Sequence, residues 1–327
     1  MTRLLIHENA YQRIEKQVSD LEESVDFIFL MPDGTFKLKD QTLKPEELQA
    51  DITWLSVDMM IFNQMEQYIK LVLEAHNIKW LQTFHAGLDI PFYRKFYENG
   101  IRITKSDAQA VCIAEYVIAN VLALYQGIFD RKEHQAEHKW QNTRFREFWK
   151  TSWLIVGFGN IGQAVAKRLQ PFECDIIGVR RTPNDHPLAD GIIALPKIYD
   201  YLPQADVVVL ACALNHETSG LVNADFLAKM KPGSTIVNIA RGKLIEQNDL
   251  IAAMENGTPQ YAVLDVFDPE PLPEDSRLWD MENVIISPHS SNAGSGLIPR
   301  GDQLFVNNLR RYLEGKELYD EIDADQL

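Results

Sequence analysis

The stretch that decides the fold is WLIVGFGNIG, residues 153–162. A short apolar run ends there in glycine, and a helical pattern rich in alanine and valine follows at residues 163–169. This order predicts a strand, a tight turn and a helix, with Gly157, Gly159 and Gly162 in the positions of a G-x-G-x-x-G fingerprint. Gly157 would allow the sharp turn, and Gly159 would let a pyrophosphate approach the backbone. Gly162 would let the helix pack close to the strand.

The fingerprint by itself also fits an ordinary glycine-rich turn, but its surroundings favour a dinucleotide site. A second apolar run follows the helical pattern at residues 175–179, as in a βαβ unit that binds a dinucleotide. Asn160 and Ile161 lie where a helix N-terminus presents unpaired N–H groups and a partial positive charge to phosphates. We therefore expect these two residues and the three glycines to bind the cofactor.

Composition predicts a globular protein with two domains. The 327 residues are 46% hydrophobic and include no low-complexity tract, so two domains of ordinary size are expected. A formal net charge of −15 argues against nucleic acid or an anionic membrane surface as a partner. The three cysteines are dispersed, and neither a signal sequence nor a membrane-spanning run is recognisable. We expect a cytoplasmic protein with no nucleic-acid or membrane partner.

Short apolar runs alternate with helical patterns through the whole chain. The expected strands lie at residues 4–7, 25–31, 35–38 (one arm of a hairpin), 52–57, 79–84, 101–104, 153–156, 175–179, 207–211, 235–238, 262–266 and 284–287. The expected helices lie at residues 10–18, 59–76, 92–99, 107–128, 163–169, 223–230, 248–256 and 296–314. The charged and aromatic segment 131–150 is expected to be a connecting arm.

This alternation predicts an α/β fold in which helices cover parallel sheets. We expect two Rossmann-like, doubly wound parallel-sheet domains with a cleft between them. Residues 105–292 would form the dinucleotide-binding domain. Residues 1–104 and 293–327 would form a discontinuous substrate domain, because the last helix is expected to cross back to the first sheet.

Three further stretches follow expected strands at their carboxyl ends, where open α/β sheets bind ligands. They read VNIARG at residues 237–242, LDVFDPEPLP at 264–273 and IISPH at 285–289. Taken singly, each has a plain interpretation: an exposed arginine, an acidic proline-rich loop, and a histidine that follows a strand.

Taken together, these stretches resemble the D-isomer-specific 2-hydroxyacid dehydrogenase family in their order and spacing. The resemblance extends over nearly the whole chain. It is strongest at residues 154–289, where it includes MKPG at 230–233 and LW at 278–279.

The resemblance implies that Arg241, Glu270 and His289 are the catalytic residues. Reduction of a 2-keto acid delivers a hydride to the carbonyl carbon and a proton to its oxygen. His289 would exchange that proton, because imidazole titrates near neutral pH, and Glu270 would favour the charged ring and fix its tautomer. Arg241 would hold the carboxylate and the carbonyl oxygen of the substrate with its fork of donors. The nicotinamide supplies the hydride, so no metal is needed, and no cluster with metal-ligand spacing is present in the sequence.

The resemblance also implies the binding residues. Ala86 and Gly87, in the stretch HAGLD, are similar to the family's carboxylate-binding loop, whose backbone N–H groups face the substrate. Asp265 would lie near the nicotinamide amide. The remaining cofactor contacts that the resemblance implies are Ala211, Cys212, Ala213, Ile239, Ala240, Arg241, His289 and Ser291.

Three departures from the family pattern leave the substrate open. The stretch 104–107 lacks the Pro-Gly that is usual where the family's chain enters the cofactor domain. Ala213 stands where many members have proline, and Ser-Ser-Asn at 290–292 replaces the commoner Ala-Gly after the histidine.

The residues after the second strand of the dinucleotide unit predict which cofactor is preferred. NAD-selective sites carry an acidic residue about twenty positions beyond the glycines, which binds the ribose 2′-OH. Here Arg180 stands in that place, followed by Arg181 and Thr182. Two positive charges and a hydroxyl suit a 2′-phosphate, and the alternative is that both arginines lie solvated on a loop. We expect NADP, as NADPH, to be preferred, with NAD as the weaker alternative.

The sequence thus predicts an NADP-preferring dehydrogenase that reduces a small 2-keto acid to a D-2-hydroxy acid, with glyoxylate or hydroxypyruvate favoured. The alternatives are a reductase of bulkier 2-keto acids and a redox-sensing binding protein on the same fold. The resemblance further implies a homodimer formed through the helix at 107–128 and the arm at 131–150.

Overall fold

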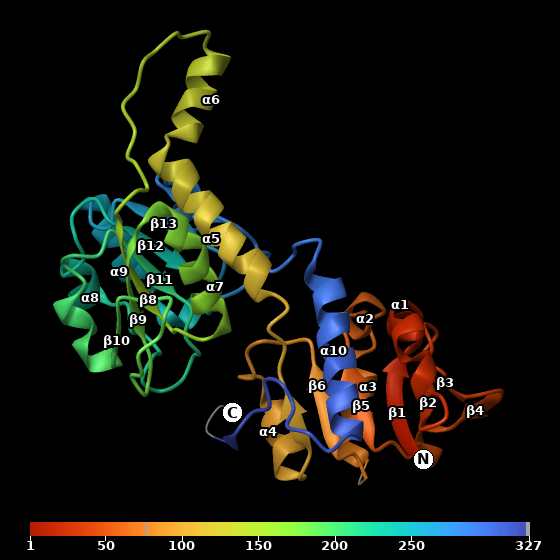
Figure 1. Cartoon of the computed structure of the whole chain (residues 1–327). Coiled ribbons are helices and arrows are strands. Elements are labelled where there is room, and N and C mark those ends of the chain that lie inside the picture. The colour runs from red at the N-terminus through yellow and green to blue at the C-terminus, as the bar shows by residue number, and fades with distance from the viewer. Residues whose placement is uncertain (76, 325–327) are drawn as a thin grey trace. The chain divides into compact units, whose positions relative to one another are not determined.

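The computed structural model describes residues 1–75 and 77–324 and divides the chain into two units (Figure 1). The first domain consists of Met1–Ala108 and Ser295–Leu327, and the second domain of Gln109–Gly294. These limits lie four and two residues beyond the expected ones at 104 and 292. Position 76, the expected end of a helix, and the last three residues of the expected substrate domain lie outside the described residues.

The first domain is built on a seven-stranded sheet in the order β4-β3-β2-β1-β5-β6-β7. Its strands are β1 (Thr2–His7), β2 (Val25–Leu30), β3 (Phe36–Leu38), β4 (Gln41–Leu43), β5 (Ile52–Leu55), β6 (Trp80–Thr83) and β7 (Arg102–Thr104). The strands pair in parallel except at β3 and β4, which form an antiparallel edge. The expected hairpin arm is confirmed by β3, whereas β4 was not expected because it is short and polar.

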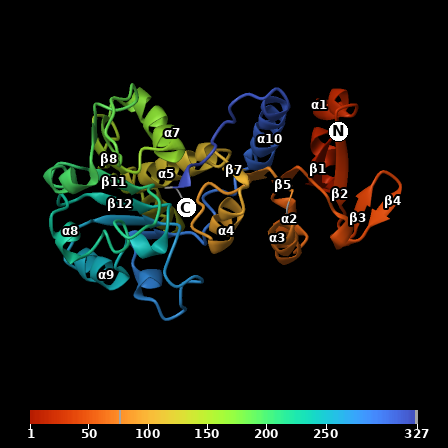
Figure 2. The ribbon, with the colours of Figure 1, turned by 90° about the horizontal axis from the view of Figure 1, so that it is seen from below.

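Helices cover both faces of this sheet (Figure 2). They are α1 (Glu8–Val18), α2 (Asp58–Ile61), α3 (Met65–Glu74), α4 (Pro91–Glu98) and α10 (Leu297–Leu313). Leu4 and Ile6 of β1 pack with α1 and α10, whereas Leu5 between them packs with α3 and α4. This alternation follows from the two-residue period of a strand. Phe305 of α10 stacks on Trp54 with ring centroids 4.0 Å apart, which joins the last helix to the first sheet.

The helix expected at 59–76 is broken in the structure. It ends at Ile61 in α2 and resumes at Met65 in α3. Between the two helices Asn63 has a φ of 55°, in the left-handed region that asparagine adopts more readily than most residues. The hydrophobic period continues across this break, so the pattern alone did not indicate it.

The second domain is built on seven strands that all pair in parallel, in the order β10-β9-β8-β11-β12-β13-β14. Its strands are β8 (Ser152–Val156), β9 (Asp175–Val179), β10 (Gly191–Ile193), β11 (Val207–Leu210), β12 (Thr235–Asn238), β13 (Tyr261–Leu264) and β14 (Val284–Ile286). The strand order reverses at β8, which makes this a doubly wound sheet with its switch point between β8 and β11. The predicted fold class is confirmed.

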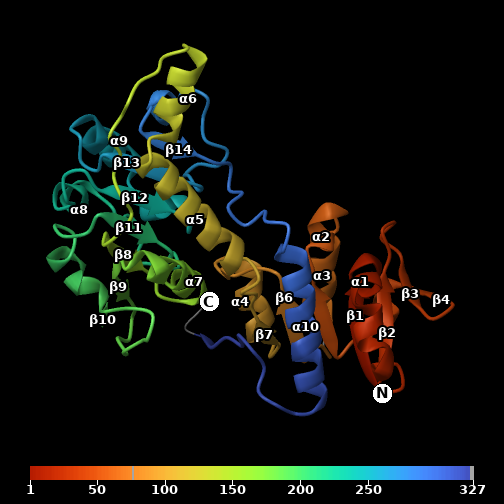
Figure 3. The ribbon, with the colours of Figure 1, turned by 45° about the horizontal axis from the view of Figure 1, so that its top comes forward.

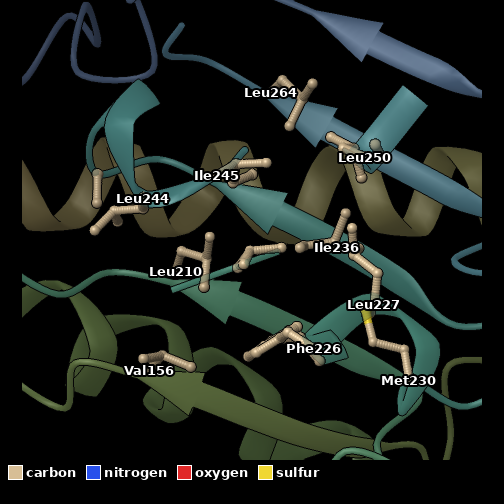
Figure 4. Packing of buried hydrophobic residues seen from close by; sticks show 14 of the residues in the cluster. Val156, Leu210, Phe226, Leu227, Met230, Ile236, Leu244, Ile245, Leu250 and Leu264 are labelled. Atoms are coloured by element: carbon tan, nitrogen blue, oxygen red, sulfur yellow. The ribbon is translucent and has the colours of Figure 1, made fainter. Parts of the chain in front are cut away.

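Helices also cover both faces of the second sheet. They are α5 (Ala110–Tyr125), α7 (Asn160–Leu169), α8 (Ala224–Ala228) and α9 (Gln247–Glu255), whereas α6 (Ile128–Ala136) stands out from the domain (Figure 1) and none of its residues is buried. On one face α5 and α7 lie side by side (Figure 3). On the other face, Phe226 of α8 and Leu250 of α9 pack with the strand residues Leu210, Ile236 and Leu264 (Figure 4).

The long helix expected at 107–128 is shorter than predicted. It ends at Tyr125, and Gly127 takes a φ of 57° before α6, which begins at Ile128 and extends into the segment 131–150 that was expected to be an arm. Among the described residues, no single helix combines the length and hydropathy needed to cross a membrane. The pair α5 and α6 reaches that length and composition together but is bent by 57°.

Candidate active site

The expected cofactor loop lies at the switch point of the second sheet, after β8. Gly157 has a φ of 97°, and a Cβ there would lie 2.5 Å from the carbonyl carbon of Ala211, so only glycine fits this turn against the end of β11. A Cβ on Gly162 would overlap the carbonyl oxygen of Gly157, so α7 starts tightly against the turn. Gly159, in contrast, faces open space, because no atom lies within 4 Å of the position of its Cβ.

These three environments fit a dinucleotide. The open side of Gly159 leaves room for a pyrophosphate, and no side chain caps the N-terminus of α7 at Asn160 and Ile161. The N–H groups of the first helical turn and the helix dipole therefore suit a phosphate.

The turn after β11 lies beside this loop. The Ala211 N–H donates to Val156 O at 2.7 Å, which ties the end of β11 to the end of β8. Cys212 is half-buried, and burial raises the pKa of its thiol to about 11, so it stays protonated at neutral pH. Ala213 is exposed, and its carbonyl accepts the Thr218 hydroxyl at 2.8 Å.

Arg180, at the end of β9, is brought to the glycine loop. Its Nε donates to Phe158 O at 2.9 Å, and its backbone N–H donates to Ile193 O at the same distance. The side chain is half-buried, whereas Arg181 and Thr182 are exposed. The guanidinium of Arg180 is therefore held beside the turn that would bind the cofactor.

Asp265, just after β13, is a fully buried carboxylate that organises the next loop. Its Oδ1 accepts the Ser287 hydroxyl at 2.5 Å and the Ser290 N–H at 2.8 Å. The Ser291 N–H is shared between Oδ1 at 3.1 Å and Oδ2 at 3.0 Å. The His289 N–H donates to the Asp265 carbonyl at 2.8 Å, so the whole segment around the histidine is attached to one residue.

The expected histidine and glutamate are paired. His289 Nδ1 lies 3.0 Å from Glu270 Oε2, and Glu270 Oε1 accepts the Phe267 N–H at 3.0 Å. Burial acts to raise the pKa of Glu270, but the contacts with His289 and Phe267 and the charge of Arg241 outweigh it and hold the pKa below its usual range. His289 itself has a φ of 51°, a backbone conformation that non-glycine residues rarely adopt.

Arg241 follows β12 and lies against the segment that carries Glu270. A Cβ on Gly242 would overlap the carbonyl of Phe267, so glycine permits the close approach of the two loops. Asn238 Nδ2 donates to Arg241 O at 2.8 Å, and the Ala240 N–H donates to Asn238 Oδ1 at 3.2 Å. One guanidinium nitrogen of Arg241 donates to Ala240 O at 2.7 Å.

The structure thus gathers the predicted residues of the second domain at one edge of its sheet. Ile239 and Ala240 are buried in the turn before Arg241, and the Ile239 N–H donates to Leu210 O at 3.3 Å. Ala86 and Gly87 belong to the first domain, in the loop after β6. That loop is anchored on either side of them, by a hydrogen bond from the Ser106 N–H to His85 O at 2.9 Å and by the buried side chain of Leu88.

Several polar residues of this edge were missed in the sequence. Ser287, Ser290 and Tyr116 form the surroundings of Asp265, and Asn238 supports the arginine loop. A polar residue at the carboxyl end of an apolar strand was the available signal for Asn238 and Ser287. In the described part of the chain, no group of three His, Cys, Asp or Glu side chains is arranged to hold a metal ion.

Several known proteins are similar to this chain. Residues 118–291 match the model of the D-isomer specific 2-hydroxyacid dehydrogenase, NAD binding domain. A human glyoxylate reductase/hydroxypyruvate reductase is 31% identical over 268 residues, which cover 77% of this chain and 80% of the relative. A glyoxylate/hydroxypyruvate reductase A from Arabidopsis thaliana is 31% identical over 257 residues, covering 76% and 80%. A solved structure of a D-isomer specific 2-hydroxyacid dehydrogenase family protein from Aeromonas salmonicida matches with a TM-score of 0.76 and 28% identity, covering 98% of each chain.

Proposed function

The chain belongs to the D-isomer-specific 2-hydroxyacid dehydrogenase family of oxidoreductases, and from that membership we propose that it reduces a small 2-keto acid to the D-2-hydroxy acid. The observation that carries this proposal is the contact of His289 with Glu270 at 3.0 Å, beside Arg241 and on the same sheet edge as the glycine loop. Glyoxylate and hydroxypyruvate are the favoured substrates, because the two reductases described above act on them by name.

The paired side chains account for the proton of this reaction. When bound, the nicotinamide supplies the hydride. His289 delivers a proton from Nε2 to the substrate oxygen, because its Nδ1 faces the Glu270 carboxylate. The carboxylate stabilises the charged ring before the transfer and keeps Nδ1 protonated after it.

The substrate is held by its carboxylate. Arg241 offers a fork of donors to the carboxylate and to the carbonyl oxygen, on which negative charge develops during the reaction. The backbone N–H groups of Ala86 and Gly87 are the second set of donors in this proposal. Asp265 accepts a hydrogen bond from the nicotinamide amide, while Ile239, Ala240, Ser291 and residues 211–213 line the cofactor.

The cofactor proposed is NADP, with NAD as the weaker alternative. Support comes from Arg180, whose Nε–H donates to Phe158 O at 2.9 Å and holds the guanidinium beside the glycine loop, where its other N–H groups could bind a 2′-phosphate. Arg181 and Thr182 add a second charge and a hydroxyl. An aspartate at position 180 would repel the same phosphate.

We also propose that the chain forms a homodimer through α5, α6 and the following arm. Trp140 is fully exposed, and Phe145 and Trp149 are more than half exposed, on a segment that stands out from the body of the second domain (Figure 1). The segment 131–150 carries six basic and three acidic side chains in a chain of net charge −15. A second copy of this chain therefore offers the complementary charge as well as apolar surface.

The first prediction concerns the reaction itself. With NADPH, the protein should turn over glyoxylate or hydroxypyruvate, and His289→Ala should lower turnover by at least about 10²-fold, a typical contribution of a general acid. A panel that also contains pyruvate and phenylpyruvate identifies the substrate class. Preference for phenylpyruvate would favour the bulkier-substrate alternative, and binding of NADPH without turnover of any keto acid would favour the sensing alternative.

The second prediction concerns pH. Glu270, whose pKa is held below its usual range, faces His289 Nδ1 at 3.0 Å, and we propose that its negative charge stabilises the protonated ring. In Glu270→Gln this stabilisation is lost, so keto-acid reduction should fail at a lower pH than in the wild type as the pH is raised. The check is the pH profile of kcat/KM for both proteins. If the two profiles coincided on the alkaline side, Glu270 would not stabilise the protonated ring of His289.

The third prediction concerns cofactor selectivity. Two charge-assisted contacts of about 1.5–3 kcal/mol each correspond to a preference for NADPH over NADH of about a hundredfold or more. Screening by salt would reduce this preference toward tens if the contacts are partly exposed. Arg180→Asp should abolish this preference, chiefly by raising the KM for NADPH. As the control, Lys229→Asp makes the same change of charge at the amino-terminal edge of the sheet and should leave the preference for NADPH intact. Equal catalytic efficiency of the wild type with both cofactors would contradict the assignment.

The fourth prediction concerns assembly. Light scattering at micromolar concentration should give twice the mass of the chain. Trp140→Ala combined with Phe145→Ala should shift the population toward monomer, because Trp140 is fully exposed and Phe145 is 54% exposed in the described chain. Trp279→Ala removes a tryptophan that is 50% exposed but lies outside the arm, so this variant should remain dimeric. A monomeric wild type would refute the dimer.

A further inference from the structure

Two residues outside the catalytic set are connected in series to the buried carboxylate of Asp265. The hydroxyl of Tyr116, on α5, lies 2.7 Å from Ser287 Oγ. Ser287 Oγ in turn lies 2.5 Å from Asp265 Oδ1. Neither Tyr116 nor Ser287 is used in the reaction as proposed, and all three residues belong to the second domain.

The direction of the hydrogen bonds in this series follows from the donor inventory. Asp265 meets the Ser287 hydroxyl and two backbone N–H groups, so it acts as an acceptor only. The single hydrogen of Ser287 is therefore committed to Asp265, and Tyr116 must donate to Ser287. Burial raises the pKa of Tyr116 to about 12, so the phenol retains the hydrogen that it donates at neutral pH.

The two oxygens of Asp265 are occupied unequally. Oδ1 accepts from the Ser287 hydroxyl, from the Ser290 N–H and from the Ser291 N–H. Among the described residues, the donor to Oδ2 is the N–H of Ser291, at 3.0 Å, which Oδ2 shares with Oδ1. A carboxylate has about four acceptor sites and three donors are present here, one of them shared between the oxygens, so Oδ2 retains the capacity to bind one more donor.

We propose that Tyr116 and Ser287 are positioning residues for the nicotinamide end of the cofactor, because they hold Asp265 Oδ1 and so direct Oδ2 to the amide N–H of the nicotinamide ring. This inference rests on the proposed function. Tyr116 and Ser287 act through Asp265 and touch neither the substrate nor the adenosine end of the cofactor.

The position of α5 supports this role. Besides the contact of Tyr116, the thiol of Cys112 donates to Asn292 O at 3.2 Å, so the helix is attached to the histidine loop on both sides of His289. The helix itself is anchored by buried residues such as Val117 and Val121, which pack on the sheet. The hydroxyl of Tyr116 therefore extends from a rigid element to the loop.

The experiment compares two ligands that differ in the nicotinamide. Isothermal titration calorimetry of the whole protein would measure the Kd of NADPH and of 2′-phospho-ADP-ribose, which lacks the nicotinamide. Ser287→Ala should raise the Kd of NADPH by about tenfold, because a hydrogen bond to a charged group is lost. The same substitution should leave the Kd of 2′-phospho-ADP-ribose unchanged. Tyr116→Phe should act in the same direction but less strongly, and Ser287→Thr, which keeps the hydroxyl, should bind both ligands as the wild type does.

Tyr125→Phe is the matched control. Tyr125 lies on the same helix, and its hydroxyl donates to Asp206 O at 3.3 Å, at the amino-terminal end of β11. Loss of that hydroxyl removes a comparable contact from α5 but should leave both dissociation constants unchanged. A structural effect of losing any α5 hydroxyl would appear in this variant as well.

Each remaining outcome is decisive. If Ser287→Ala weakened the binding of both ligands equally, the site as a whole would have loosened. If the Kd of NADPH were unchanged, the hydroxyl would not direct Oδ2. Either result overturns the inference and leaves the proposed function standing. A wild type that binds neither ligand would overturn the proposed function, and the inference with it.

Discussion

The buried carboxylate of Asp265 is the constraint on which the arrangement of the site depends. A charge without exposure to solvent must be met by hydrogen-bond donors, because burial of an unpaired carboxylate is costly. Here the donors are Ser287, Ser290 and Ser291, on either side of His289. Meeting the charge therefore also fixes the segment that carries the histidine, including its left-handed backbone conformation.

A second constraint is the parallel sheet, which brings distant parts of the chain to one edge. Arg241, Glu270 and His289 follow three neighbouring strands, β12, β13 and β14, and the glycine loop follows β8. Close approach of the backbones is achieved by glycine where a Cβ would overlap a carbonyl, at Gly157 against Ala211 and at Gly242 against Phe267. Because these contacts are between backbones, no side-chain rotation could relieve a substitution at either position.

Much of this arrangement could be predicted from the sequence, for physical reasons. The glycine fingerprint indicates a dinucleotide site only where it lies between a buried strand and a helix, and here an apolar run at 153–156 precedes it and a helical pattern at 163–169 follows it. The carboxyl ends of parallel strands lie together, so motifs at 237–242 and 285–289 could be placed at one edge without knowing any distance. The series from Tyr116 to Ser287 could not be predicted, because its partners are 171 residues apart and meet only through tertiary packing.

The errors in the expected secondary structure have a common cause. Hydrophobic periodicity does not report single residues in the left-handed region, so the breaks at Asn63 and Gly127 were missed and two helices were predicted too long. The helix α6 was missed because its sequence lacks an apolar stripe at helical spacing, and in the structure none of its residues is buried.

The stereochemistry of hydride delivery tests the central claim most directly. The protein would be given NADPH that carries deuterium at both C4 positions, together with hydroxypyruvate, whose reduction creates a stereocentre at C2, and the product would be examined by NMR and chiral chromatography. The account predicts a D-2-hydroxy acid with deuterium at C2, because the hydride comes from the nicotinamide while His289 supplies only the hydroxyl proton. An L-product, or a product without deuterium at C2, would contradict it.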